Sequence, residues 1–399
     1  MEAATASVKR LPGWLTALLP VLLLGAAIGL FVALDAPGLD RVGVPQEELA
    51  VERTVLRPGE IELHLRNDGA DPVRVEQAIV NDAFAAFTQT DQEIGRLRSA
   101  EVTVDYPWIE GQSYEVMLLT ATGATVDHAI DAAAESPDAD VGFYGLMALI
   151  GIYVGVIPVA IGMLWLPWVR TMDARWMRFI LAFTVGLLTF LGIDALLEGT
   201  ELAGQGAEAL GGAGLVWLGA VGAYLVLAGV DAWLGERRGR AAAGSGEDAL
   251  GERAAFLVAL GIGLHNLGEG LAIGSAYAVG SLALGAALVV GFAIHNTTEG
   301  LAIVAPVARS GRVRTRTLVL LGLLAGAPAI LGAWIGASAF NPSLAALMFG
   351  IGAGAIAQVI VQIARQMRGA EGRGLTPGVA AGLLLGLVVM YVTGLLVSV

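Results

Sequence analysis

Long apolar runs separated by short polar segments dominate this chain. Each run holds about 20 residues, enough for a helix to cross ~30 Å of hydrocarbon. Nine runs can be read, at 14–34, 141–165, 177–197, 213–234, 254–275, 281–304, 318–339, 344–363 and 379–398. The pattern predicts an all-α polytopic membrane protein, with an N-terminal transmembrane anchor in residues 1–38 and an eight-helix domain in residues 141–399.

Basic residues occur in every second loop of this arrangement. They precede the first run and follow the second, fourth, sixth and eighth, as Lys9 and Arg10, then Arg170, Arg175 and Arg178, then Arg237, Arg238, Arg240 and Arg253, then Arg309, Arg312, Arg314 and Arg316, then Arg365, Arg368 and Arg373. Basic loops stay on the cytoplasmic side. We therefore expect a protein integral to the cell (plasma) membrane, with its N-terminus cytoplasmic and its C-terminus extracytoplasmic.

The first run allows two interpretations. Its basic start and the small residues near Ala33 and Ala36 are typical of a cleaved secretory signal peptide. Its apolar core, however, is longer than the roughly 7–15 residues of such signals. We therefore favour a retained anchor.

Residues 39–140 follow a period of two instead of a helical period. Apolar residues alternate with polar ones, and a turn signal, Asn67-Asp68-Gly69, interrupts them. The alternation is carried by Ile61, Leu63, Leu65, Val73, Val75, Val102, Val104, Tyr114, Val116 and Leu118. This predicts a small extracytoplasmic β-sandwich domain. It contains His64 and His128 but no metal-ligand spacing, and its role is open between a cap, a dimerisation module, a partner-binding domain and a cation concentrator.

Composition and net charge add to these predictions. The chain has 399 residues, is 56% hydrophobic and carries a net charge of −13. The stretch from Asp40 to Asp140 accounts for the whole negative excess, so the membrane part is close to neutral. Cysteine is absent, which excludes disulfides and thiolate metal sites. Among 55 glycines, three pairs at i, i+4 predict close helix contacts in lipid, Gly332 with Gly336, Gly350 with Gly354 and Gly382 with Gly386.

One segment occurs twice in the middle of neighbouring apolar runs. Residues 261–273 read GIGLHNLGEGLAI, and residues 291–303 read GFAIHNTTEGLAI. In a helix, the His and Glu of each copy are i and i+4 and share one face. The connection between the two runs is short, so the helices are predicted to be antiparallel neighbours whose motifs meet at one depth.

A charged residue at the centre of a membrane helix costs about 2.5–3.5 kcal/mol on insertion scales, so these side chains need a partner. His265, Glu269, His295 and Glu299 offer two imidazoles and two carboxylates, which one divalent cation such as Zn²⁺ would neutralise. Asn266 and Asn296 could add a second, oxygen-rich site beside it. Alternatively, the two asparagines bridge helices as structural hydrogen-bonding residues.

These motifs resemble the ZIP (zinc/iron permease-like) metal transporters, a resemblance that covers about two thirds of the chain. It implies a ZIP-like bundle of eight helices with a binuclear-type site at mid-membrane, which carries divalent metal toward the cytoplasm. By motif match, His265, Asn266, Glu269, His295, Asn296 and Glu299 take the metal-ligand roles. The chain departs from the family in having Gly268 and Thr298 where proline often precedes the glutamate, and no histidine in the loop at 235–253.

The expected function is therefore transport of a divalent metal ion, with Zn²⁺ as the leading substrate and Fe²⁺, Mn²⁺ or Cd²⁺ also admitted by the ligand types. The alternatives are an intramembrane zinc-dependent hydrolase and a metal-gated receptor. The chain lacks a His-Glu-x-x-His motif and a nucleotide-binding loop, so we expect neither an enzyme nor an ATP-driven pump. The expected partners are metal ions and the lipid bilayer, without nucleic acid; a homodimer stays open.

Other polar residues in or near the apolar runs allow two interpretations each. Asp194 and Glu198, followed by Glu201 and Glu208, form either an acidic funnel for cations or an ordinary solvated helix end. Asp231 is expected to pair with Arg237 or Arg238 rather than to serve metal exit. Gln358 and Gln362 are expected to form interhelical hydrogen bonds rather than to ligate metal.

Overall fold

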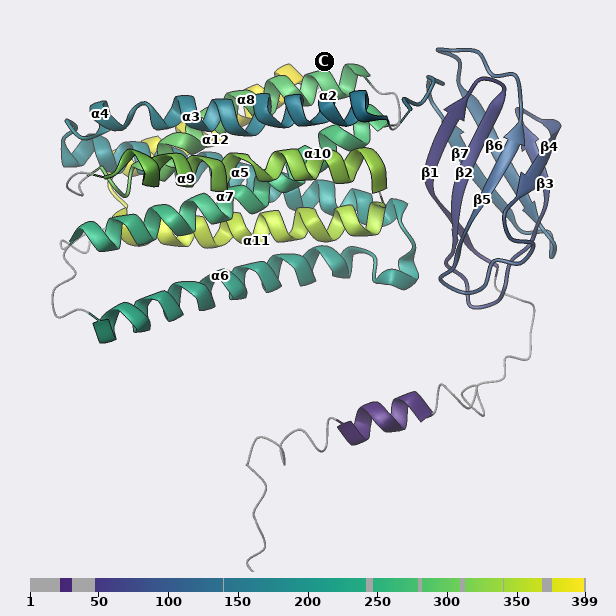
Figure 1. Ribbon diagram of the computed structural model, residues 1–399, viewed down its shortest axis with the longest axis horizontal. Coiled ribbons are helices and arrows are strands. Elements are labelled where there is room, and N and C mark those ends of the chain that lie inside the picture. Colours follow the sequence, from purple (N-terminus) through teal and green to yellow (C-terminus); the bar gives the residue numbers. More distant parts are fainter. Residues whose placement is uncertain are drawn as a thin grey trace, which may run out of the picture. The chain divides into compact units, whose positions relative to one another are not determined.

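In the computed structural model, the chain forms a small antiparallel β domain and a larger helical bundle (Figure 1). The structure describes residues 22–30, 47–138, 140–241, 247–278, 282–308, 313–339, 341–367 and 375–397. The predicted anchor at 14–34 therefore lies mostly outside the described residues, although residues 22–30 are helical. The side chains of Arg237, Arg238 and Arg240, and the basic residues at 9–10, 309–312 and 368–373, lie outside them too.

The β domain contains seven strands, which confirms the predicted β structure, but the strands form one continuous antiparallel sheet rather than the two separate sheets of the predicted β-sandwich. The strands are β1 (Leu49–Arg57), β2 (Glu60–Asn67), β3 (Val75–Val80), β4 (Ala83–Gln89), β5 (Ser99–Asp105), β6 (Tyr114–Thr120) and β7 (Thr125–Ile130). They pair in the order β1-β2-β5-β4-β3-β6-β7, entirely antiparallel. The alternating residues Ile61, Leu63 and Leu65 are fully buried, because successive side chains of a strand point to opposite faces.

The helical bundle follows from residue 141 onward. Its elements are α2 (Val141–Gly151), the π-helix η1 (Ile152–Val156), α3 (Ile157–Met163), α4 (Leu166–Val169), α5 (Ala174–Gln205), the short 3-10 helix η2 (Glu208–Leu210), α6 (Ala213–Ala241), α7 (Glu247–Ala278), α8 (Leu282–Val304), α9 (Thr315–Gly326), α10 (Pro328–Ala339), α11 (Pro342–Met367) and α12 (Pro377–Val397). Figure 1 shows the long helices lying roughly alongside one another. α7 packs against α8, α10 and α11, and thus lies at the centre of the bundle.

Seven helical segments in the described part of the chain are long and apolar enough to cross a membrane, which confirms a polytopic helical architecture. They are Val141–Val169, Ala174–Gln205, Ala213–Trp233, Gly251–Ala278, Thr315–Ser338, Pro342–Arg365 and Pro377–Leu395. The predicted run at 281–304 appears as α8, in which the apolar stretch Val289–Val304 is shorter than the other seven. With α8, all eight predicted runs after residue 140 are helical.

Two of these segments are irregular where they face the repeated motifs. The segment Val141–Val169 changes from α-helix to π-helix at Ile152–Val156 before it returns to α-helix. The segment Thr315–Ser338 breaks between Gly326 and Pro328, because proline has no N–H that could donate a hydrogen bond to the carbonyl one turn earlier. Local π-helix and proline breaks free backbone carbonyls from their intrahelical partners.

Glycines allow the helix backbones to touch, as the i, i+4 spacing predicted. A Cβ on Gly332 would lie 2.0 Å from the Leu267 carbonyl oxygen, and one on Gly336 would lie 2.2 Å from that of Leu271. The other two pairs likewise face carbonyl oxygens, Gly350 and Gly354 those of Val216 and Ala220 in α6, and Gly382 and Gly386 those of Phe179 and Phe183 in α5. No side chain fits at such distances, so only glycine permits these contacts.

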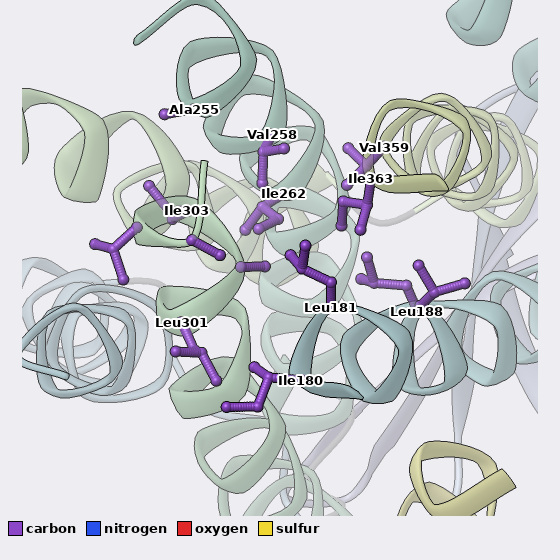
Figure 2. Packing of buried hydrophobic residues seen from close by; sticks show 14 of the residues in the cluster. Ile180, Leu181, Leu188, Ala255, Val258, Ile262, Leu301, Ile303, Val359 and Ile363 are labelled. Carbon is purple, nitrogen blue, oxygen red and sulfur yellow. The ribbon is translucent and has the colours of Figure 1, made fainter. Parts of the chain in front are cut away.

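The largest apolar core of the bundle joins α5, α7, α8 and α11 (Figure 2). We call its central part the apolar plug, formed by Ile180, Leu181, Leu188, Val258, Ile262, Leu301, Ile303, Val359 and Ile363. These side chains are at most 9% exposed. In α7 they precede His265 and in α8 they follow Glu299, so in antiparallel helices they lie on one and the same side of the repeated motifs.

Candidate metal centre

The two repeated motifs meet inside the bundle, as their position in neighbouring helices predicted. His265 and Glu269 come from α7, and His295 comes from α8. His265 Nε2 lies 3.1 Å from Glu269 Oε1, and His295 Nε2 contacts the same carboxylate oxygen directly. A ligand atom of each residue lies within 4.8 Å of the others. Glu269 is therefore the hub of a buried His/Glu/His cluster.

The two asparagines each tie a motif to an irregular helix. Asn266 Nδ2 donates to the Ala325 carbonyl oxygen at 3.0 Å, just before the proline break between α9 and α10. Asn296 Nδ2 donates to the Val154 carbonyl oxygen at 3.1 Å, in the π-helix η1. The structural role of both asparagines as interhelical donors is thus observed. The sequence did not predict these two backbone carbonyls as hydrogen-bond acceptors at the site, since no side-chain motif marks them.

Asn296 also reaches into the cluster. Its Nδ2 lies 2.9 Å from Glu269 Oε2, the oxygen that does not contact the histidines. Glu269 is thereby held at both oxygens, by histidine on one side and by the asparagine amide on the other. Such supporting hydrogen bonds orient a metal ligand and exclude its other rotamers.

Glu299 is placed differently from the other three predicted ligands. It is only 2% exposed, and neither of its carboxylate oxygens has a hydrogen-bond partner. It interacts electrostatically with His265, Glu269 and His295, yet it is not part of the group within 4.8 Å. A buried carboxylate without a donor is costly, which makes it a natural ligand for a cation that reaches the cluster.

Further unpaired acceptors surround the motifs. The side-chain oxygens of Asn266 and Asn296 have no hydrogen-bond partner, whereas the Nδ2 groups of both residues donate to backbone carbonyls. Together with two imidazoles and two carboxylates, they give a set of nitrogen and oxygen ligands without sulfur. That set fits a borderline or hard divalent cation. The six assigned ligand roles stay predictions, but the chemistry of the residues agrees with them.

Gly352 of α11 packs closely against His265. A Cβ on Gly352 would lie 3.4 Å from the His265 Cα and 3.7 Å from its Nδ1. Farther along α11, Gln358 and Gln362 leave their side-chain oxygens without a hydrogen-bond partner, although Gln358 is only 4% exposed. The interhelical hydrogen bonds predicted for these carbonyls are therefore not found among the described residues.

The acidic residues of α5 lie on the side of the buried cluster that faces away from the apolar plug. Asp194 interacts electrostatically with His295, His265 and Glu269, and Glu198 interacts with Glu201 and Asp194. These interactions link the carboxylates of α5 electrostatically with the buried cluster. The acidic funnel and the ordinary solvated helix end both stay predictions.

Asp231 forms ion pairs, as expected, and the side chains of Arg237 and Arg238, the partners predicted for it, lie outside the described residues. Arg253 of α7 contacts both its carboxylate and its backbone carbonyl, and Arg365 of α11 lies 3.5 Å from its second carboxylate oxygen. The partners come from distant parts of the sequence, which loop proximity alone does not reveal. The pairing joins α6, α7 and α11 at the end of the bundle where the basic loops lie.

A further group of potential ligands lies in the β domain. Glu62, His64 and Glu101 bring one ligand atom each within 4.8 Å of the others. From the sequence we expected no metal-ligand spacing in this domain, and Glu62 and His64, at i and i+2, lie on one face of β2. The third residue comes from a different strand, and its register could not be read from the sequence.

No protein-family model matches the chain, and no curated protein matches it either.

Proposed function

We propose that this protein is a divalent metal ion transporter of the ZIP type, with Zn²⁺ as its leading substrate. The observation that carries the proposal is the buried His265, Glu269 and His295 cluster at the centre of a bundle of apolar, membrane-length helices. Intramembrane ionisable residues that face a bundle interior mark ion pathways more often than they stabilise a fold.

The substrate would bind between α7 and α8. His265, His295 and Glu269 supply the first ligands, and Glu299 joins them with its unpaired oxygens. Two imidazoles and two carboxylates neutralise a divalent cation and suit four-coordinate Zn²⁺. The side-chain oxygens of Asn266 and Asn296 can complete a larger coordination shell for Fe²⁺ or Mn²⁺.

Access to the site would come along α5. The carboxylates of Glu201, Glu198 and Asp194 follow one another toward the cluster and attract cations over the short range that salt leaves unscreened. On the opposite side, the apolar plug closes the bundle toward the basic loops. If these loops are cytoplasmic, release of metal to the cytoplasm requires the packed helices around the plug to shift, which is alternating access.

The test is metal flux into proteoliposomes that contain a divalent-sensitive dye. We expect saturable Zn²⁺ uptake by the native protein and its loss in Glu269→Gln combined with Glu299→Gln, which keeps side-chain size and removes both charges. Glu252→Gln, an exposed carboxylate on the same helix α7, is the matched control and should retain uptake.

Two outcomes would overturn the proposal. Saturable binding without flux under any gradient would favour a metal-gated receptor. Metal-dependent hydrolysis of a peptide or ester by the reconstituted protein, again without flux, would favour an intramembrane hydrolase.

A further inference from the structure

The outer face of the β domain carries a separate arrangement of metal-binding side chains. β2 and β5 pair so that His64 lies directly opposite Glu101, and Glu62 lies opposite Thr103. The residues between them, Leu63 and Val102, are fully buried on the other face. Since side chains alternate along a strand, Glu62, His64 and Glu101 all project from the outer face.

The geometry within this group is tight. His64 Nε2 lies 2.7 Å from Glu62 Oε1, and the ligand atoms of all three residues fall within 4.8 Å of one another. The other oxygen of Glu62 lies 3.9 Å from Arg57 Nε. Glu62 thus turns one oxygen toward Arg57 and the other toward His64.

We propose that Glu62, His64 and Glu101 bind a divalent cation on the face of the β domain. One imidazole and two carboxylates form a nitrogen and oxygen ligand set that suits Zn²⁺, Mn²⁺, Fe²⁺ or Co²⁺. The two carboxylates balance the charge of the ion. Three protein ligands leave at least one coordination position for water.

The environment supports binding rather than a simple surface ion pair. The side chains of Glu62 and His64 are 17% and 35% exposed, so the group is largely shielded yet open to solvent. Cross-strand neighbours fixed by ladder hydrogen bonds hold the ligands in place before metal arrives, which lowers the entropic cost of binding. The inference goes beyond the transport proposal and does not depend on it, because the residues belong to another domain.

The experiment uses the full-length protein in detergent with Glu269→Gln and Glu299→Gln, so that the buried centre does not contribute. Co²⁺ is titrated, and its visible absorption and the bound metal per chain after desalting are measured. We expect a saturable d–d band and one bound ion, both lost in the additional variant His64→Ala. Equal binding with and without His64 would overturn the proposal.

A matched control excludes a general effect of charge. Glu60 and Asp105 lie opposite each other one step along the same face of the same two strands. Glu60→Gln with Asp105→Asn removes two carboxylates there and should leave the Co²⁺ band unchanged. If this control removes the band as well, a diffuse acidic surface binds the ion and the proposal fails.

A second measurement does not depend on the folding of the His64 variant. In the protein that retains His64, Zn²⁺ should protect this imidazole from diethylpyrocarbonate, as read by peptide mass spectrometry. His128 provides an internal reference, because its Nε2 is already hydrogen-bonded to Thr54 Oγ1 at 2.7 Å and lies outside the group. Modification of His64 that Zn²⁺ does not slow would contradict the site.

Discussion

Asn296 joins Glu269 to the backbone of a neighbouring helix, since its Nδ2 lies 2.9 Å from Glu269 Oε2 and 3.1 Å from the Val154 carbonyl oxygen. The amide therefore orients the hub of the buried cluster and anchors it to the π-helix. We predict that Asn296→Ala lowers the apparent affinity for Zn²⁺ roughly 10- to 100-fold, as loss of a supporting hydrogen bond does at metal sites. Zn²⁺ uptake as a function of concentration measures this.

The neighbouring Thr297 supplies the control for that variant. Its hydroxyl donates to the Ala293 carbonyl within α8, and among the described residues it forms no hydrogen bond with the cluster. Thr297→Ala should therefore leave the affinity unchanged. A similar loss of affinity in both variants would show that α8 as a whole is disturbed.

The glycines on either side of Glu269 should differ sharply in their tolerance to substitution. A Cβ on Gly270 would lie 2.0 Å from the Ala329 carbonyl oxygen, whereas a Cβ on Gly268 meets nothing within 4 Å. Overpacking of this kind costs about 1–3 kcal/mol. We predict a lower melting temperature for Gly270→Ala and little change for Gly268→Ala, measured by loss of the monodisperse peak in size-exclusion chromatography after heating. Equal melting temperatures would contradict the close contact of α7 with α10.

The apolar plug should open during transport. The native chain has no cysteine, so Ile262→Cys introduces a single thiol at a position that is only 1% exposed. We predict that a hydrophilic thiol reagent does not label it in the metal-free protein and labels it in proteoliposomes that take up Zn²⁺. Arg314→Cys, at the exposed start of α9, should react under both conditions. An Ile262 thiol that stays unreactive during uptake would place the exit path elsewhere.

Asp194 should influence how fast cations arrive. Its carboxylate interacts electrostatically with the buried cluster and is not a member of it. We predict that Asp194→Asn raises the KM for Zn²⁺ at low ionic strength, with a smaller effect at high salt, because screening weakens the attraction in both proteins. An unchanged KM at low salt would show that Asp194 and its neighbours form an ordinary solvated helix end.

The stability of the β domain should depend on His128. Burial lowers the pKa of this imidazole below its usual value. The unfolded chain then binds a proton more readily than the folded domain, so stability falls as the pH drops through about 6.5 and stops falling below the pKa in the folded state. One proton over one pH unit limits the loss to about 1.4 kcal/mol between pH 6.5 and 5.5.

Hydrogen exchange of the β1 and β7 peptides in the full-length protein, corrected for intrinsic rates, reads this change. In His128→Gln, which keeps a hydrogen-bonding side chain beside Thr54, the part of the pH dependence due to the imidazole should vanish. An identical pH dependence in both proteins would assign it to the carboxylates of the domain instead.

The chain itself determined the main architecture, because hydrophobic periodicity and the length of apolar runs are local properties. Runs of about 20 apolar residues became membrane-length helices, and the alternation around Ile61 became strands. The repeated His-Asn-x-x-Glu motifs placed His265, Glu269 and His295 on facing helices. The three glycine pairs marked where backbones touch, since close approach depends on the absence of a side chain.

Only the tertiary structure decided how these parts meet. The carbonyls of Val154 and Ala325 accept hydrogen bonds from Asn296 and Asn266, and no side-chain motif in the sequence marks these two carbonyls as partners. Asp231 pairs with Arg253 and Arg365, which come from other helices. Glu101 joined Glu62 and His64 through strand register. Each of these contacts links residues distant in sequence, and their distances are fixed by packing rather than by the local pattern of the chain.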